Sequence, residues 1–123
     1  MRDAILSIRN RLDRAGVLLS GLCAAHCLLS IIVVSVLGLG GQILLAPAIH
    51  EFGLMLAILI GALTLGLGVL RHRKRSPLAI GAVGLTLMGL ALTVPHGLPE
   101  AMLTIAGVAL VATAHIQNLR HAA

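Results

Sequence analysis

The stretch FGLMLAILIGALTLGLGVL, residues 52–70, decides the fold, because it is 19 residues long and contains no charged side chain. A helix needs about 20 such residues to cross the hydrocarbon core of a bilayer. The run closes on the basic cluster RHRKR, residues 71–75, and basic clusters of this kind stay on the cytoplasmic side of a membrane. The stretch therefore predicts a transmembrane helix.

Three further apolar runs lie outside this one along the chain. Because each run is continuously apolar, the alternating pattern of a membrane β-barrel is excluded. We therefore predict an all-α fold, a four-helix transmembrane bundle over 15–119, with an amphipathic arm at 1–14 and a short tail at 120–123. The four predicted spans are at about 15–37, 52–70, 77–94 and 100–118.

Composition and charge placement predict the cellular location. The chain is 59% hydrophobic and 11% charged, with a mean hydropathy of +1.07, which is too apolar for an ordinary soluble domain. All nine Lys and Arg residues lie in the arm, between the second and third spans, or in the tail. The positive-inside rule then predicts a multi-pass membrane protein with both termini cytoplasmic. Nucleic-acid binding is excluded, because the basic residues only flank apolar runs and have no interleaved aromatics.

Both cysteines and one histidine fall in the first span, at Cys23, His26 and Cys27. The i, i+3 and i+4 spacing places all three side chains on one face of a helix. An intrahelical disulfide would be strained, since i, i+4 β-carbons are about 5–6 Å apart and a disulfide needs about 3.8 Å. Thiolates prefer soft ions such as Cu(I), Zn(II) and, by the same softness, Hg(II). The cluster predicts a metal site in the cytoplasmic half, near the midplane, and simple helix packing is the alternative.

The other histidines are candidate additional ligands. His72 and His115 lie near the predicted cytoplasmic ends of the second and fourth spans, where an interfacial role is the alternative. His50 and His96 lie on the outer side, where they could collect incoming cations. Asp13 is expected to cap and orient the first helix. The sequence shows no nucleophile or acid–base constellation, so we expect no catalytic residue and no enzyme.

Five parts of the sequence can be compared with a known family: Leu12-Asp-Arg-Ala-Gly16, Leu19-Ser20, Leu22-Cys-Ala-Ala-His-Cys27, His72 and Ala114-His-Ile-Gln-Asn-Leu-Arg120. Together they resemble the MerC family of mercury-resistance proteins, which implies a location in the bacterial inner membrane. The resemblance is to a short member that lacks the C-terminal cysteine pair of the better-known transporters. It implies a four-helix protein that takes up mercuric ion and passes it to the cytoplasm, with Cys23 and Cys27 as ligands.

The expected function is therefore soft-metal transport, with Hg(II) as the first candidate ion. Zinc or copper transport, an accessory metal-binding role and a haem-binding membrane protein remain alternatives. The expected partners are membrane lipid, the metal ion, a cytoplasmic metal acceptor and a second copy of the chain. No cofactor beyond the bound or transported ion is expected.

Overall fold

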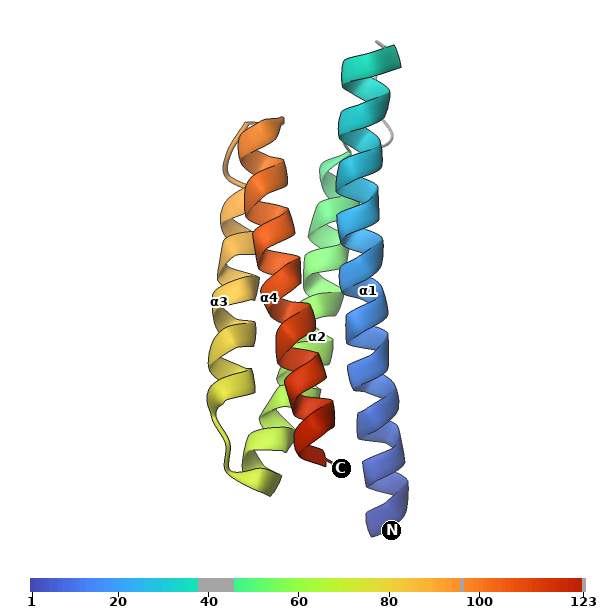
Figure 1. Ribbon diagram of the computed structural model, residues 1–123, viewed down its shortest axis with the longest axis vertical. Helices are drawn as coiled ribbons and strands as arrows, with labels where there is room; N and C mark the ends of the chain where they lie inside the picture. Colours follow the sequence, from blue (N-terminus) through green and yellow to red (C-terminus); the bar gives the residue numbers. More distant parts are fainter. Residues whose placement is uncertain (38–45, 96, 123) are drawn as a thin grey trace.

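The computed structural model describes residues 1–37, 46–95 and 97–122, which form a bundle of four helices (Figure 1). They are α1 (Arg2–Leu37), α2 (Pro47–His72), α3 (Ser76–Ala91) and α4 (Leu98–Ala122). No strand occurs in the described ranges. Successive helices run antiparallel, so both ends of the chain lie at the same end of the bundle (Figure 1). The predicted all-α, four-helix architecture is confirmed.

Helix α1 continues through the position where the predicted arm meets the predicted span. No proline occurs between Arg2 and Leu37, so no residue of that kind interrupts the backbone hydrogen bonds. At about 1.5 Å per residue, the 36 residues of α1 are about 54 Å long. It packs into the bundle from its third turn onward, because Arg9 and Asp13 are buried. The structure therefore shows no helix boundary near residue 14.

Three of the four helices are long and apolar enough to cross a membrane, over Arg2–Ser30, Ala48–His72 and Leu98–His121. Helix α3 is shorter, since its 16 residues extend about 24 Å and the hydrocarbon core is about 30 Å thick. We expected this span to reach residue 94, but the helix ends at Ala91. The N–H of Leu92 bonds the Gly89 carbonyl at 3.2 Å, which tightens the last turn. Pro95 then disfavours a helical conformation for the residue before it.

Helix α4 is central to the packing, because it contacts α1, α2 and α3. The buried core consists of Ala57, Met88, Val108 and Val111, with Leu19 and Cys23 packed against it. The backbones of α3 and α4 approach closely, since a β-carbon on Gly84 would lie 2.6 Å from the Gly107 carbonyl oxygen. Small residues permit such approaches in membrane helices, where packing rather than apolar burial drives association.

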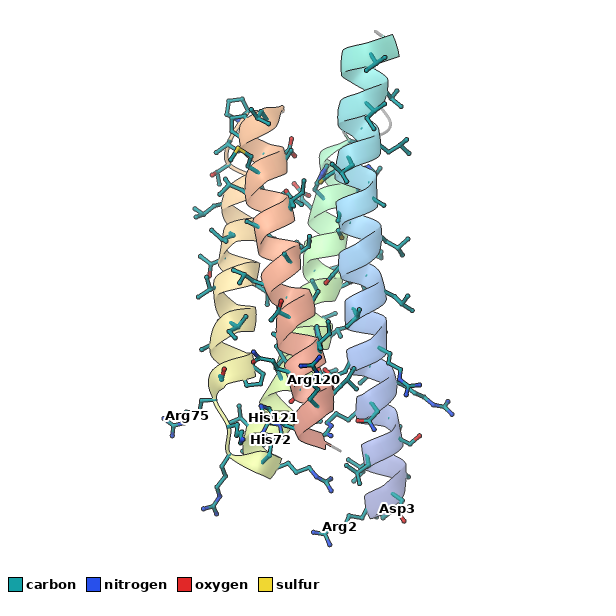
Figure 2. All side chains as sticks on the ribbon, viewed as in Figure 1. Arg2, Asp3, His72, Arg75, Arg120 and His121 are labelled. Atoms are coloured by element: carbon teal, nitrogen blue, oxygen red, sulfur yellow. The ribbon has the colours of Figure 1, made fainter. Side chains whose placement is uncertain are left out.

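The basic residues gather at the end of the bundle that holds the two termini. Figure 2 shows Arg2, Arg75 and Arg120 at this end, with His72 and His121 beside them. We call it the basic end. The positive-inside rule predicts that it faces the cytoplasm.

Candidate metal site

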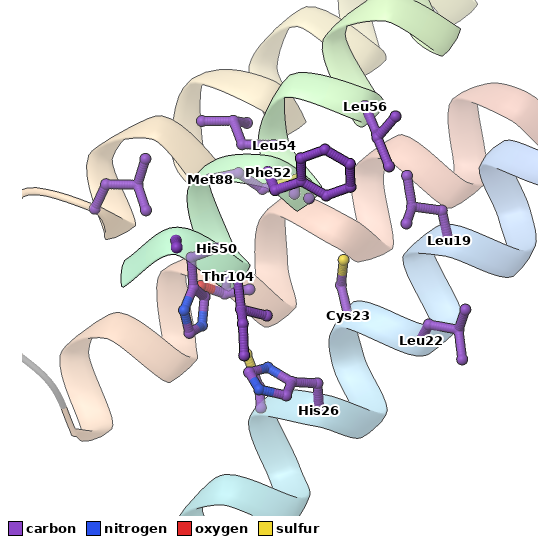
Figure 3. A pocket seen from close by; sticks show the side chains of 15 residues that line it. Leu19, Leu22, Cys23, His26, His50, Phe52, Leu54, Leu56, Met88 and Thr104 are labelled. Atoms are coloured by element: carbon purple, nitrogen blue, oxygen red, sulfur yellow. The ribbon is translucent and has the colours of Figure 1, made fainter. Parts of the chain in front are cut away.

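Cys23, His26 and Cys27 line one cavity of about 730 Å³ (Figure 3). We call it the cysteine cavity. The three side chains leave the same face of α1, as their i, i+3 and i+4 spacing predicts. All four helices contribute to a lining that is mostly apolar. The lining outside α1 includes His50, Phe52, Gly53 and Leu54 of α2, Met88 of α3, Leu92 directly after α3, and Thr104 of α4.

Three potential ligands converge at one side of the cysteine cavity, and they come from two helices. One ligand atom each from His26, Cys27 and His50 lies within 4.8 Å of the others. Metal–sulfur and metal–nitrogen bonds of a zinc-sized ion are about 2.0–2.3 Å, so ligands on opposite sides of the ion are about 4–4.6 Å apart. Small side-chain adjustments would therefore bring all three atoms onto one ion. Of the four additional histidines in the sequence prediction, the described structure brings His50 to this cluster.

Two imidazole nitrogens of the cluster are buried and have no hydrogen-bond partner among the described residues, His26 Nε2 and His50 Nδ1. Leaving a buried polar atom unsatisfied costs about 1–3 kcal/mol. The two rings pack edge to face with centroids 5.2 Å apart, and the adjacent Cys27 is only 5% exposed. A bound cation would satisfy both nitrogens and would stabilise the Cys27 thiolate.

Glu100 adds a carboxylate beside the cluster. Its Oε1 lies 3.7 Å from His50 Nε2, which is longer than a direct hydrogen bond. Metal-binding histidines usually have a carboxylate, carbonyl or water next to their second ring nitrogen. The sequence shows His50 just before the second predicted span and Glu100 at the start of the fourth. It did not predict that these two side chains would meet across helices.

Cys23 lies one helical turn from Cys27 and is not among the three converging residues. Its sulfur lies 3.8 Å from the position that a β-carbon on Gly53 would occupy. Cys23 also lines a second, much smaller cavity, which reaches toward Gly16 and His115. Its thiol therefore stands between the metal cluster and the interior of the bundle.

The cluster lies nearer the end of the bundle opposite the basic end. His50 is in the first turn of α2 and Glu100 is in the first turn of α4, and both helices begin at that end (Figure 1). We expected the cysteines in the half near the termini, from a count that began at residue 15. The difference arises because α1 is already part of the packed bundle at Arg9. If the basic end is cytoplasmic, the cluster is accessible from the outer half of the membrane.

His115 and His72 belong to a separate polar cluster nearer the basic end. Asp13 Oδ1 accepts a hydrogen bond from His115 Nδ1 at 2.7 Å, and Asp13 Oδ2 accepts one from Asn118 Nδ2 at 2.8 Å. Asn118 Nδ2 also donates to the Thr64 carbonyl at 3.1 Å, and Asn118 Oδ1 lies 3.0 Å from His72 Nε2. These bonds connect α1, α2 and α4. Neither histidine contributes to the converging cluster at Cys27.

Asp13 was expected to be a helix cap, and that expectation is wrong. The residue is 0% exposed and lies well inside α1, with both carboxylate oxygens bonded to α4. A buried charge is tolerated only when it is paired and hydrogen-bonded. The signal in the sequence was the i, i+3 pair His115 and Asn118, which presents two polar groups on one face of an otherwise apolar helix. His96 lies outside the described residues.

The absence of a side chain at Gly16 leaves space for the His115 ring of the polar cluster. A β-carbon there would lie 2.5 Å from His115 Nε2, whereas a β-carbon on Gly21 would meet no atom within 4 Å. We expect Gly16→Ala to lower the free energy of unfolding by about 1–3 kcal/mol through overpacking. Gly21→Ala is the matched control on the same helix and should be neutral or slightly stabilising, by up to about 1 kcal/mol. Unfolding in mixed detergent micelles measures both, and equal effects would contradict the close approach.

The fold and the cluster together define a class, a small helical membrane protein with a buried cysteine–histidine group suited to a soft metal. The family model of the MerC mercury resistance protein matches residues 13–120, nearly the whole chain. The chain belongs to the MerC mercury resistance family, which confirms the resemblance in its sequence. Comparisons with curated proteins and with solved structures find no match.

Proposed function

We propose that this protein carries a soft metal ion, with Hg(II) as the first candidate, into the cytoplasm across the bacterial inner membrane. The observation that carries the proposal is the convergence of Cys27, His26 and His50 in a mostly apolar cavity, where two ring nitrogens have no partner within the described ranges. Polar groups at this depth in a membrane bundle are costly and usually functional. Membership of the MerC family supports mercury as the ion. The protein acts as a transporter and not as an enzyme.

The order of the ligands along α1 supports a stepwise path. The ion binds first at Cys27 with His26 and His50, and it then moves to Cys23, about 6 Å farther along the helix. Beyond Cys23, the small cavity leads to His115, whose Nε2 is buried without a partner among the described residues. Exchange between ligands would move the ion toward the basic end, where a cytoplasmic acceptor collects it. The chain contains no phosphate-binding G-x-x-x-x-G-K-[ST] motif to couple transport to ATP.

Zinc is the second candidate ion, and the mixed donor set favours it. Zinc readily binds one sulfur together with two imidazole nitrogens. Of these three ligands, only the thiolate favours Cu(I). Competition between Hg(II), Zn(II) and Cu(I) for the purified protein separates these ions. The haem alternative needs His72 and His115 as a facing pair of axial ligands. Haem binding there is disfavoured, because His72 Nε2 lies 3.0 Å from Asn118 Oδ1 and His115 Nδ1 is hydrogen-bonded to Asp13 at 2.7 Å.

Uptake of radioactive Hg(II) by cells that produce the protein tests the proposal. We expect wild type to raise uptake above that of cells without the protein, and the double variant Cys23→Ser, Cys27→Ser to return it to background at equal membrane abundance. Uptake that is unchanged in the double variant would refute transport through these thiols. Metal binding without any uptake by wild type would instead identify an accessory binding protein.

The contribution of His50 can be measured separately. We expect His50→Ala to weaken Hg(II) or Zn(II) binding by at least about tenfold, because it removes a ligand and a second-shell change alone costs about 10–100-fold. Glu51→Ala is the matched control, since Glu51 is the next residue of α2 and is exposed. Isothermal titration with a competing chelator gives both affinities. Equal affinities for the two variants would remove His50 from the site.

A further inference from the structure

Arg9 is an unusual residue in this bundle, because its side chain is charged and almost fully buried. It is 2% exposed, and its Nε and Nη1 atoms have no hydrogen-bond partner among the described residues. Nη2 makes one long contact, 3.4 Å to Asn10 Oδ1. The nearest buried carboxylate along α1, Asp13, is already bonded to α4. A buried guanidinium without a counter-charge is strongly destabilising, and the described residues supply no counter-charge to Arg9.

Arg9 lines a cleft of about 230 Å³ between α1 and α2. Arg71, in the last turn of α2, lines the same cleft, and no carboxylate does so. Two guanidinium groups on one cleft repel each other unless an anion lies between them. The remaining walls are apolar, from Ile5, Leu6, Leu67 and Leu70. The cleft thus combines two arginines that can bind an anion with apolar walls that can pack against a hydrocarbon chain.

The position of the cleft matches a lipid headgroup. It lies at the basic end of the bundle, beside the start of α1 and the end of α2 (Figures 1 and 2). Arginine binds phosphate by two parallel hydrogen bonds, and basic pockets between transmembrane helices on the cytoplasmic side bind anionic headgroups. A free phosphate ion would use the two arginines but would leave the four apolar side chains without a partner.

We propose that this cleft binds an anionic phospholipid, with Arg9 and Arg71 on the phosphate and the acyl chains along the apolar walls. The site lies apart from the cysteine cavity and does not depend on metal transport. Its chemistry requires a phosphate attached to hydrocarbon, and both parts are needed for tight binding. The lipid would supply the counter-charge that buried Arg9 lacks.

Thermal unfolding of the full chain in an uncharged detergent tests the proposal, with phosphatidylglycerol, phosphatidylcholine or inorganic phosphate added. We expect phosphatidylglycerol to raise the Tm of wild type more than either other addition. Arg71→Gln changes an exposed residue and should reduce that rise by at least half, as should Arg9→Gln. Arg11→Gln removes the same charge from an exposed position of α1 and should keep the full rise.

Native mass spectrometry of the same proteins gives a readout that does not depend on folding stability. We expect wild type and Arg11→Gln to retain phosphatidylglycerol, and Arg71→Gln to lose it. Equal stabilisation by inorganic phosphate would show a free-anion site and overturn the lipid assignment. Equal stabilisation by phosphatidylcholine, or equal retention in Arg71→Gln and Arg11→Gln, would also overturn it.

Discussion

Cys27→Ser is expected to weaken Hg(II) binding by more than about 100-fold, whereas Cys23→Ser should leave the affinity within about tenfold of wild type. The difference follows from the structure, because Cys27 converges with His26 and His50, and Cys23 does not. Both variants should nevertheless lose uptake, since Cys23 lies between the cluster and the small inner cavity. Competition with a small dithiol on the purified protein measures the affinities.

The single variants distinguish two arrangements of the site. If the two cysteines bind the ion together, each serine variant will lose binding to the same extent. If the ion is held by one sulfur and two imidazoles, only Cys27→Ser will weaken binding strongly. Equal losses would therefore contradict the geometry described here, even though metal binding itself would be retained.

Asp13→Asn is expected to lower the free energy of unfolding by about 1–3 kcal/mol, the usual cost of leaving a buried hydrogen-bonding group without its partner. The amide is close in shape to the carboxylate, but its NH₂ group would face the Asn118 NH₂, which donates to Asp13 Oδ2 in wild type. Asn118 cannot simply turn over, because its Oδ1 lies 3.0 Å from His72 Nε2. Unfolding in mixed micelles of increasing denaturing detergent measures the loss.

The control for this variant is Asp3→Asn, which removes the same charge from an exposed position of α1. It should change the unfolding free energy by less than about 0.5 kcal/mol. A loss in Asp13→Asn of only about 0.6 kcal/mol, the average for a hydrogen bond between membrane helices, would mean that the charge contributes nothing beyond its hydrogen bonds. In that case Asp13 would join α1 to α4 only as strongly as an ordinary interhelical hydrogen bond, which would contradict the larger loss expected here.

The helices themselves were predictable, because each long apolar run has to satisfy its backbone hydrogen bonds internally in a membrane. The run at 52–70 lies within α2, and Cys23, His26 and Cys27 share one face of α1 as predicted. Helix ends were less predictable. Hydropathy alone does not predict that α3 ends at Ala91, or that α1 is packed against the bundle from Arg9 onward.

The partners across helices could not be predicted, because they depend on register between segments far apart in the sequence. Periodicity places Cys27 on a face but does not show that the first turn of α2 brings His50 to it. For the same reason Asp13 resembled a cap, although its partners lie in α4. The sequence shows which residues share one face of a helix. Which residues of two different helices contact each other is known only from the packed structure.

X-ray absorption at the mercury edge of the purified protein loaded with one Hg(II) per chain tests the central claim most directly. Our account predicts one sulfur neighbour with nitrogen neighbours in wild type, loss of the sulfur in Cys27→Ser, and loss of nitrogen in His26→Ala or His50→Ala. A wild-type spectrum with two sulfur neighbours that the histidine variants leave unchanged, or a sulfur neighbour that persists in Cys27→Ser, would contradict it.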